Sequence, residues 1–249
     1  MNQKGKAFGV SGFALHIIAM SVMFVDHIGA SAPDLIWMRA IGRLAFPIFA
    51  FLIAEGFYHT SSVVKYLERL LIFGLISEIP FDLYFFDTVY YPWHQNVMWT
   101  FLLSLLVIWP INYYKDKVHP FIWIAITGFS GALGWYAGDV LMVDYGGCGV
   151  LTVLVFFLFR ERGYVNRACQ LLLMVYINFV MLGGWTVEVN AFGSSMIIAL
   201  QGLAVFSLVL IWLYNGEHGY YNKTIKYFYY SFYPGHLAIL AALGALGVL

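Results

Sequence analysis

Charged side chains are scarce in this sequence. Asp, Glu, Lys and Arg together make up 10% of its 249 residues, whereas 62% of the residues are hydrophobic. A soluble domain of this length needs a more charged surface, so the composition excludes a soluble globular protein and predicts a multi-pass membrane protein. A membrane-spanning helix takes roughly 20 apolar residues. Nine stretches meet that requirement, near residues 9–30, 37–58, 64–86, 97–114, 119–137, 145–160, 166–184, 194–214 and 232–249.

These stretches also lack the alternation of apolar and polar residues that is typical of membrane strands. They are rich in Leu, Phe and Ala, which favours helices over a β-barrel. The connections between them are short and leave no room for a separate soluble domain. The sequence therefore predicts an all-α membrane bundle of about nine transmembrane helices, which forms one domain over residues 1–249.

Cysteines and the common catalytic motifs are few or absent. The two cysteines, Cys148 and Cys169, are predicted near opposite faces of the membrane, so they cannot bond to one another. The sequence contains no Walker loop, HExxH, CxxC or GxSxG motif. ATP hydrolysis, zinc proteolysis, thiol redox chemistry and serine hydrolysis are therefore unsupported, and no metal site is predicted.

The few basic residues are unevenly distributed. With the N-terminus in the cytoplasm, the positive-inside rule is satisfied by nearly every Lys and Arg, and the C-terminus falls outside. Only Arg39 and Arg43 fall on the outer side. The residues on the predicted cytoplasmic side are Lys4, Lys6, Lys65, Arg69, Lys115, Lys117, Arg160, Arg162, Arg167, Lys223 and Lys226.

Ionisable residues inside the predicted spans are the candidates for function. A charge at the centre of a bilayer costs about 2.5–3.5 kcal/mol on insertion scales, so it usually faces a partner or a watery cavity. The adjacent Asp26 and His27 suggest a general base, since a carboxylate commonly orients such a histidine. A wetted histidine at the helix end is the alternative. Arg39 is interpreted as an interfacial anchor, and the deeper Arg43 as a buried partner of Asp26, Glu78 or an anionic substrate group.

Further candidates lie in the second and third spans. Glu78 and Asp82 share one helix face around Pro80, and two carboxylates this close favour one of them as a proton carrier. Glu55 and His59 lie four residues apart, where a structural pair and a functional site are equally compatible with the spacing.

The loops add a smaller set of polar candidates. Gln95 and Asn96 precede the fourth span, where helix capping is the simpler interpretation. Asp144 and Tyr145 open the glycine-rich DYGGCGV, which is predicted to be a bend that directs Asp144 at the site. His236, which opens the last span, is expected to face the bundle from the inner side.

Several motifs resemble those of the TraX family, integral membrane proteins named for the conjugal-transfer protein that acetylates pilin. They are MFVDHIG (23–29), IGRLAFPIFAFLIAEGF (41–57), YLERLLIFGLISEIPFDL (66–83), QNVMWTFLLSLL (95–106), DYGGCGVL (144–151), LYNGEHG (213–219) and FYYSFYPGHL (228–237). The chain more distantly resembles transmembrane acyltransferases such as heparan-alpha-glucosaminide N-acetyltransferase. This resemblance implies transfer of an acetyl group from cytoplasmic acetyl-CoA to an amine or hydroxyl on the far side, with an intramembrane histidine as base.

The resemblance also suggests roles for the candidate residues. The catalytic group would comprise Asp26, His27, Arg43, Glu78 and Asp82. The residues expected to bind acetyl-CoA are Arg69, Lys115, Arg160, Asn215, Lys223 and His236. Those expected to line the site are Glu55, Gln95, Asn96, Asp144 and Tyr145.

The partners that the resemblance implies are acyl-CoA, membrane lipids and an acceptor, which could be a pilin N-terminus, a small molecule or a glycan. No nucleic acid is expected, a homo-oligomer is compatible with the sequence, and the bacterial cytoplasmic membrane is the expected location. One departure concerns the LYNG motif, which the family usually continues with a basic pair. Here Glu217 and His218 follow, so Lys223, Lys226 or Arg160 would have to hold the phosphates of CoA.

Two other classes of function compete with acyl transfer. A proton-coupled transporter or permease could use the same buried charges as a translocation path, although no inverted repeat is evident. A structural membrane subunit would leave the intramembrane ionisable residues unexplained.

Overall fold

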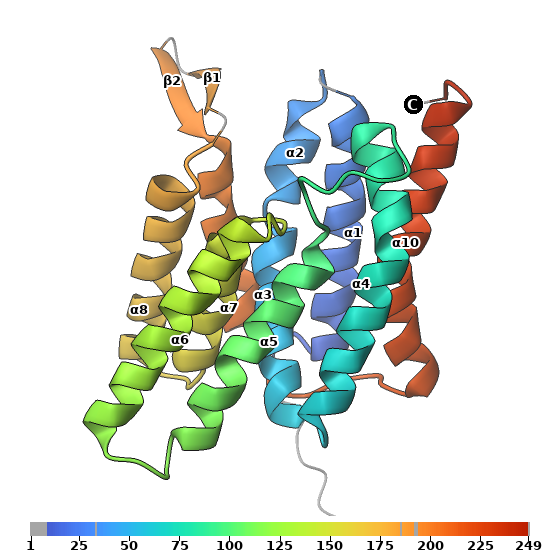
Figure 1. Ribbon diagram of the computed structural model, residues 1–249. Coiled ribbons are helices and arrows are strands. Elements are labelled where there is room, and N and C mark those ends of the chain that lie inside the picture. Colours follow the sequence, from blue (N-terminus) through green and yellow to red (C-terminus); the bar gives the residue numbers. More distant parts are fainter. Residues whose placement is uncertain (1–8, 33, 185, 192–193, 249) are drawn as a thin grey trace, which may run out of the picture.

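The protein is a bundle of helices that run up and down between two ends (Figure 1). The structure is a computed structural model and describes residues 9–32, 34–184, 186–191 and 194–248. We call the end at which the first helix begins the lower end, and the opposite end the upper end. The helices of the first half are α1 (Gly12–Ser31), α2 (Ile36–Gly42), α3 (Ala45–His59), α4 (Val63–Phe86), α5 (Val97–Tyr114) and α6 (Pro120–Val140).

The second half continues the bundle and adds a small sheet. Its elements are α7 (Gly146–Leu158), α8 (Tyr164–Val175), the π-helical η1 (Tyr176–Met181), β1 (Thr186–Ala191), β2 (Ser194–Ala199), the 3₁₀-helical η2 (Leu200–Phe206), α9 (Ser207–Trp212) and α10 (Lys223–Ala245). Helix α3 occupies the centre, where it packs against α1, α5, α7 and α9. Because its sequence is apolar on every side, it can be buried on every side.

The multi-pass helical architecture predicted from the sequence is confirmed. Five helical segments of the described residues are long and apolar enough to cross a membrane, namely Gly12–Ser31, Ile36–His59, Val97–Tyr114, Pro120–Val140 and Tyr164–Met181. Large apolar side chains such as Leu75, Ile79 and Phe129 are exposed on the bundle surface, as expected for side chains that face lipid. The count of nine crossings and the cytoplasmic N-terminus remain predictions.

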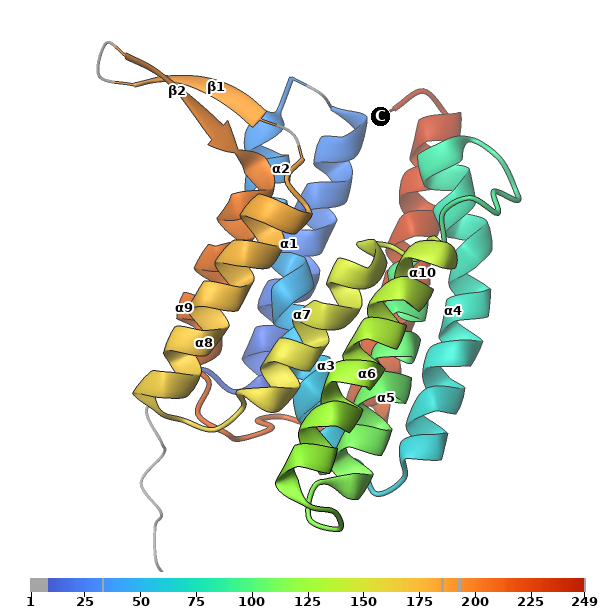
Figure 2. The same cartoon turned by 60° about the vertical axis from the view of Figure 1, so that its left-hand side comes forward.

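One local expectation was wrong. The stretch 194–214 was expected to be helical throughout, but it begins as strand β2, which pairs antiparallel with β1 from Thr186↔Ala199 to Ala191↔Ser194. β-branched residues are frequent in both segments and favour extended backbone. The hairpin projects beyond the upper end of the bundle (Figure 2).

The second predicted span is interrupted near its start. The helix breaks between Gly42 and Ala45, and Pro47 lies in the first turn of α3. An amide hydrogen has no helical partner in that turn, so a proline costs little there. The break leaves Arg43 at the junction of α2 and α3.

Helices α6 and α7 approach one another so closely that glycine is required at their contact. A Cβ atom added to Gly147 would collide with the carbonyl oxygen of Trp135. One added to Gly138 would lie 2.7 Å from the backbone nitrogen of Gly147. Small residues are the usual means by which membrane helices pack this closely.

We therefore expect Gly147→Ala to destabilise the protein by about 1–3 kcal/mol, because the helices must separate to admit the methyl group. The measurement is thermal unfolding of the purified protein in detergent. Gly128→Ala on the same helix pair is the matched control, since nothing lies within 4 Å of the added Cβ. Equal melting temperatures for Gly147→Ala and the wild type would contradict the tight contact.

Candidate functional site

Two cavities in the described part of the bundle are lined by candidate residues. The upper cavity has a volume of about 400 Å³ and is lined by the end of α1, by α2, the start of α3, the end of α4 and the turn before α7. The lower cavity has a volume of about 240 Å³ and is lined by the start of α1, the end of α3, the start of α4 and the start of α10. Phe49 and Phe101 line both cavities, so the two rings stand between them.

A buried ion cluster forms one wall of the upper cavity. Arg39 Nη1 donates to Asp26 Oδ2 at 2.7 Å, and Arg43 Nη2 donates to Asp26 Oδ1 at 2.7 Å. Of the three partners predicted for Arg43, the structure shows Asp26. The interpretation of Arg39 as a simple interfacial anchor is wrong. Two guanidinium groups against one carboxylate leave one net positive charge beside the cavity.

The backbone around this cluster is shaped to admit the carboxylate. Gly42 is the last residue of α2 and is buried against Asp26. A Cβ atom at Gly42 would collide with the Asp26 side chain, so only glycine allows α1 and α2 to approach this closely. Arg39 in the last turn of α2 and Arg43 just after it then reach the same carboxylate from one side.

A chain of hydrogen-bonded polar side chains leads from this cluster to η2 and η1. Arg43 Nη1 donates to Gln201 Oε1 at 3.4 Å, and Gln201 Nε2 donates to Asn178 Oδ1 at 2.8 Å. Asn178 lies in the π-helical turn η1, and Gln201 in η2. The sequence analysis missed Gln201. Its position in an apolar run, facing the similarly isolated Asn178, was the available signal.

His27 lines the upper cavity, but Asp26 does not orient it. His27 Nδ1 lies 2.7 Å from His236 Nε2, and His236 Nδ1 lies 2.7 Å from the carbonyl oxygen of Phe232. The carbonyl can only accept, so His236 donates from Nδ1 and accepts at Nε2. His27 therefore donates from Nδ1, which leaves its Nε2 as the nitrogen with a lone pair.

This geometry corrects two expectations. The orienting partner of His27 is His236 from α10. His236, which was expected to help bind CoA, lines neither cavity. Tyr84 supports the same helix end, since its hydroxyl donates to the His27 carbonyl and accepts from Ser31 Oγ at 2.8 Å. A histidine with a defined tautomer at a cavity is suited to accept a proton.

Glu78 and Asp82 were expected beside His27, but neither lines the upper cavity. Glu78 Oε1 accepts from Asn96 Nδ2 at 2.6 Å and from Trp99 Nε1 at 2.5 Å, at the start of α5. Asp82 Oδ2 accepts from the backbone nitrogen of Tyr91 at 2.8 Å. Both carboxylates thus hold the 87–96 loop and the start of α5, because that loop folds back over α4.

Some polar residues of the outer loops stabilise the fold, and others line the upper cavity. Asn96 caps α5 as expected, since its Oδ1 accepts from Met98 N at 3.0 Å. Gln95 also lies outside the cavity lining, in a short backbone pairing with the α6–α7 turn. Asp144 and Tyr145 do line the cavity, as expected, and His94 joins them there without having been singled out.

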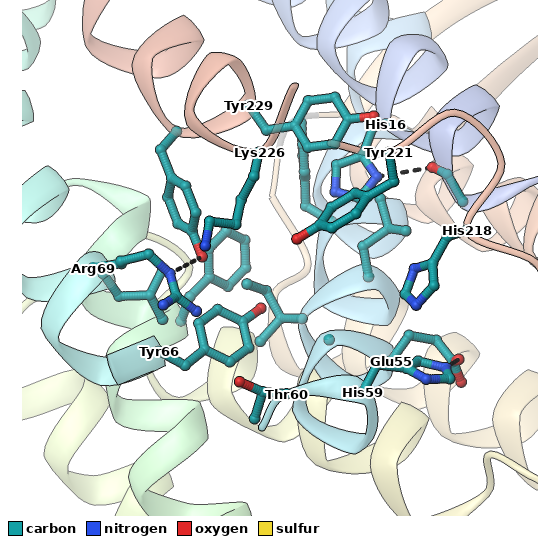
Figure 3. A pocket seen from close by; sticks show the side chains of 18 of the residues that line it. His16, Glu55, His59, Thr60, Tyr66, Arg69, His218, Tyr221, Lys226 and Tyr229 are labelled. Carbon is teal, nitrogen blue, oxygen red and sulfur yellow. Dashed lines mark hydrogen bonds and ion pairs between the residues drawn. The ribbon is translucent and has the colours of Figure 1, made fainter. Parts of the chain in front are cut away.

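The lower cavity is rich in histidine, tyrosine and basic side chains (Figure 3). Of the residues expected to bind CoA or its phosphates, Arg69 and Lys226 line it. Glu55, expected to line the site, does line this cavity, and it binds Arg160 with an Nε to Oε1 distance of 2.5 Å. His218 also lines this cavity. It is one of the two residues that stand here in place of the basic pair of the family motif.

The other residues expected to bind CoA lie elsewhere. Lys115 caps the end of α5 and Lys223 begins α10; both are exposed and outside the lining. Asn215 also lies outside the lining, and its backbone nitrogen donates to the Val10 carbonyl at 2.9 Å. The described residues contain no group of three or more His, Cys, Asp or Glu side chains that could hold a metal ion.

Comparison with known proteins identifies the relatives of this chain. The family model described as TraX protein matches residues 11–244, nearly the whole sequence. The chain belongs to the TraX family. It is 28% identical over 244 residues to the probable fimbrial assembly protein FimC, serogroup H1, of Dichelobacter nodosus, and the match covers 92% of this chain and 93% of that protein.

A second relative is an uncharacterized protein of Rickettsia prowazekii (strain Madrid E). It is 25% identical over 206 residues, which cover 79% of this chain and 77% of that protein. No solved structure matches the chain significantly.

The cluster around Asp26 supports a prediction about stability. Asp26→Asn would leave two largely buried guanidinium groups without their carboxylate, and removal of one partner from a buried ion pair costs about 3–5 kcal/mol. We expect a clearly lower melting temperature in detergent. Asp116→Asn, in the exposed α5–α6 loop, is the control. If the melting temperatures of both variants equal that of the wild type, the cluster does not stabilise the fold.

Proposed function

We propose that this protein is a membrane acyltransferase that moves an acetyl group from cytoplasmic acetyl-CoA to an amine or hydroxyl acceptor at the upper end. The observation that carries the proposal is the pair of adjoining cavities. His27 lines the upper cavity and basic side chains line the lower one, with Phe49 and Phe101 between them. A donor and an acceptor that enter from opposite ends would meet at this partition.

The lower cavity has the chemistry that acetyl-CoA requires. Arg69 and Lys226 supply positive charge for phosphate groups, and His218 can add a hydrogen bond. The buried hydroxyl of Tyr229, which has no hydrogen-bond partner among the described residues, also belongs to this lining. Apolar side chains such as Leu52 would contact the uncharged arm of the donor.

The residues of the upper cavity can then handle the proton and the developing charge. Acetyl-CoA supplies a thioester whose carbonyl carbon the acceptor attacks. His27 accepts the acceptor's proton at Nε2 and later returns it to the departing thiolate sulfur, so the histidine ends each cycle neutral. The net positive charge of Arg39, Arg43 and Asp26 stabilises negative charge on the carbonyl oxygen during the attack.

The TraX relatives suggest where the acceptor comes from. One of them is named as a probable fimbrial assembly protein. A pilin amine is therefore the first acceptor to test, and the bacterial cytoplasmic membrane is the proposed location. The excess of Lys and Arg at the lower end of the described bundle supports a cytoplasmic lower end.

The central test uses purified protein in detergent and radiolabelled acetyl-CoA. We expect the wild type to bind the donor and hydrolyse it slowly, with water replacing the acceptor. His27→Gln should bind acetyl-CoA equally well but hydrolyse it at least about a hundredfold more slowly, because the proton acceptor is gone. The exposed His119→Gln serves as the control. Absence of saturable binding to the wild type would favour the permease alternative.

A second test concerns the donor site. Lys226 lines the lower cavity, whereas Lys223, one turn earlier on α10, is exposed outside it. Loss of a charged hydrogen bond costs about 1.5–3 kcal/mol, so Lys226→Gln should raise the Kd for CoA about tenfold or more. Lys223→Gln should leave the Kd unchanged. Equal weakening by both substitutions would argue against this cavity as the donor site.

A further inference from the structure

A second histidine lines the upper cavity and takes no part in the His27 pair. His94 lies in the 87–96 loop, and its Nε2 is 3.5 Å from Asp144 Oδ1 in the α6–α7 turn. From the sequence, the histidine oriented by a carboxylate was expected to be His27 beside Asp26. The structure places such a pair here instead.

The two loops that carry this pair are joined by several hydrogen bonds. Gln95 N donates to the Met142 carbonyl at 2.8 Å, and Asp144 N donates to the Gln95 carbonyl at 2.9 Å. Thr100 Oγ1 donates to the Asp144 carbonyl at 2.6 Å. The ring of His94 also stacks on Phe81 at 5.8 Å between centroids. Contacts from α4, from α5 and between the two loops therefore hold the pair in place at the cavity.

The two histidines of the cavity differ in their access to water. His27 is 9% exposed and donates from Nδ1 to another histidine. The side chain of His94 is 41% exposed. A proton taken by His27 has the leaving thiolate as its natural destination, whereas a proton taken by His94 can pass to solvent.

We infer that His94, oriented by Asp144, is a second proton acceptor of the upper cavity, which removes a proton from a protonated amine before that amine attacks. This inference rests on the proposed acyl transfer. An α-amino group has a pKa of about 7.7–8.0, so it arrives mostly as an ammonium ion at neutral pH. The ammonium must lose one proton to gain a lone pair and a second as the C–N bond forms.

The proton balance matches the two sites. The first proton goes to His94 and then to water, which accounts for the net proton that the reaction releases. The second goes to His27 and then to the thiolate as the C–S bond breaks. If His27 alone accepted both protons, it would have to release the first to solvent before it took the second. Its low exposure would make that release slow.

The charges around His94 suit this role. It faces the carboxylate of Asp144 from the α6–α7 turn and those of Glu78 and Asp82 from α4, while Phe86 contributes a ring. The interaction with Asp144 raises the pKa of His94 above its ordinary value. A raised pKa makes His94 a stronger base, and this function is lost as the pH falls below that pKa, where the ring is already protonated.

The test compares two small acceptors with purified protein and acetyl-CoA. Glycinamide is largely protonated at pH 7, whereas hydroxylamine is uncharged there and needs no prior deprotonation. We measure initial rates of acetyl transfer, with the rates without enzyme subtracted. His94→Gln should lower the ratio of the glycinamide rate to the hydroxylamine rate about tenfold or more at pH 7. Asp144→Asn should lower the same ratio.

The pH dependence separates this role from a structural one. The ratio for His94→Gln should recover toward that of the wild type above pH 8, where the amine is already neutral. His119→Gln should leave the ratio unchanged, and His27→Gln should lower both rates. A His94→Gln variant whose two rates fall equally at every pH, or do not fall, would overturn the inference.

The two proposals fail in different ways. A wild type that transfers acetyl to hydroxylamine but not to glycinamide keeps the proposed function and overturns the assignment of His94. A wild type that transfers to neither acceptor overturns the proposed function and the inference with it.

Discussion

A single carboxylate between two arginines connects the elements of the upper half of the bundle. Asp26 on α1 binds Arg39 and Arg43, which flank the break between α2 and α3. Each of these charges alone would be expensive in a membrane protein, so the three can exist there only together. The break, the glycine at position 42 and the polar chain to Gln201 are all conditions for this arrangement.

The cluster also separates two roles that the sequence seemed to combine. Asp26 and His27 are neighbours in the chain, but neighbouring residues on a helix point in directions about 100° apart. The carboxylate therefore turns to the arginines, and the imidazole turns to His236 on α10. The positive charge that can stabilise an oxyanion and the nitrogen that can accept a proton thus reach one cavity from different sides.

Features that depend on local sequence could be predicted, whereas contacts between distant parts of the chain could not. The apolar runs predicted the helices because membrane helices depend on local composition and length. The sequence reduced the partners of Arg43 to Asp26, Glu78 or an anionic substrate group, because few partners exist for a buried cation. His236 is 209 residues from His27, and no local pattern links them. Glu78 and Asp82 share a helix face as predicted, but the returning 87–96 loop uses their carboxylates for its own backbone and side-chain hydrogen bonds.

The partition between the cavities explains why the charged groups are distributed as they are. In the proposed reaction, the phosphates of the CoA donor would stay near the basic side chains at the lower end, because charged groups are costly to bury in an apolar bundle. Only a small uncharged acyl thioester would then have to reach the upper cavity. Phe49 and Phe101 are suited to that passage, because aromatic rings admit an apolar group and exclude water. Exclusion of water matters for a thioester, since water would otherwise compete with the acceptor for the same carbonyl carbon.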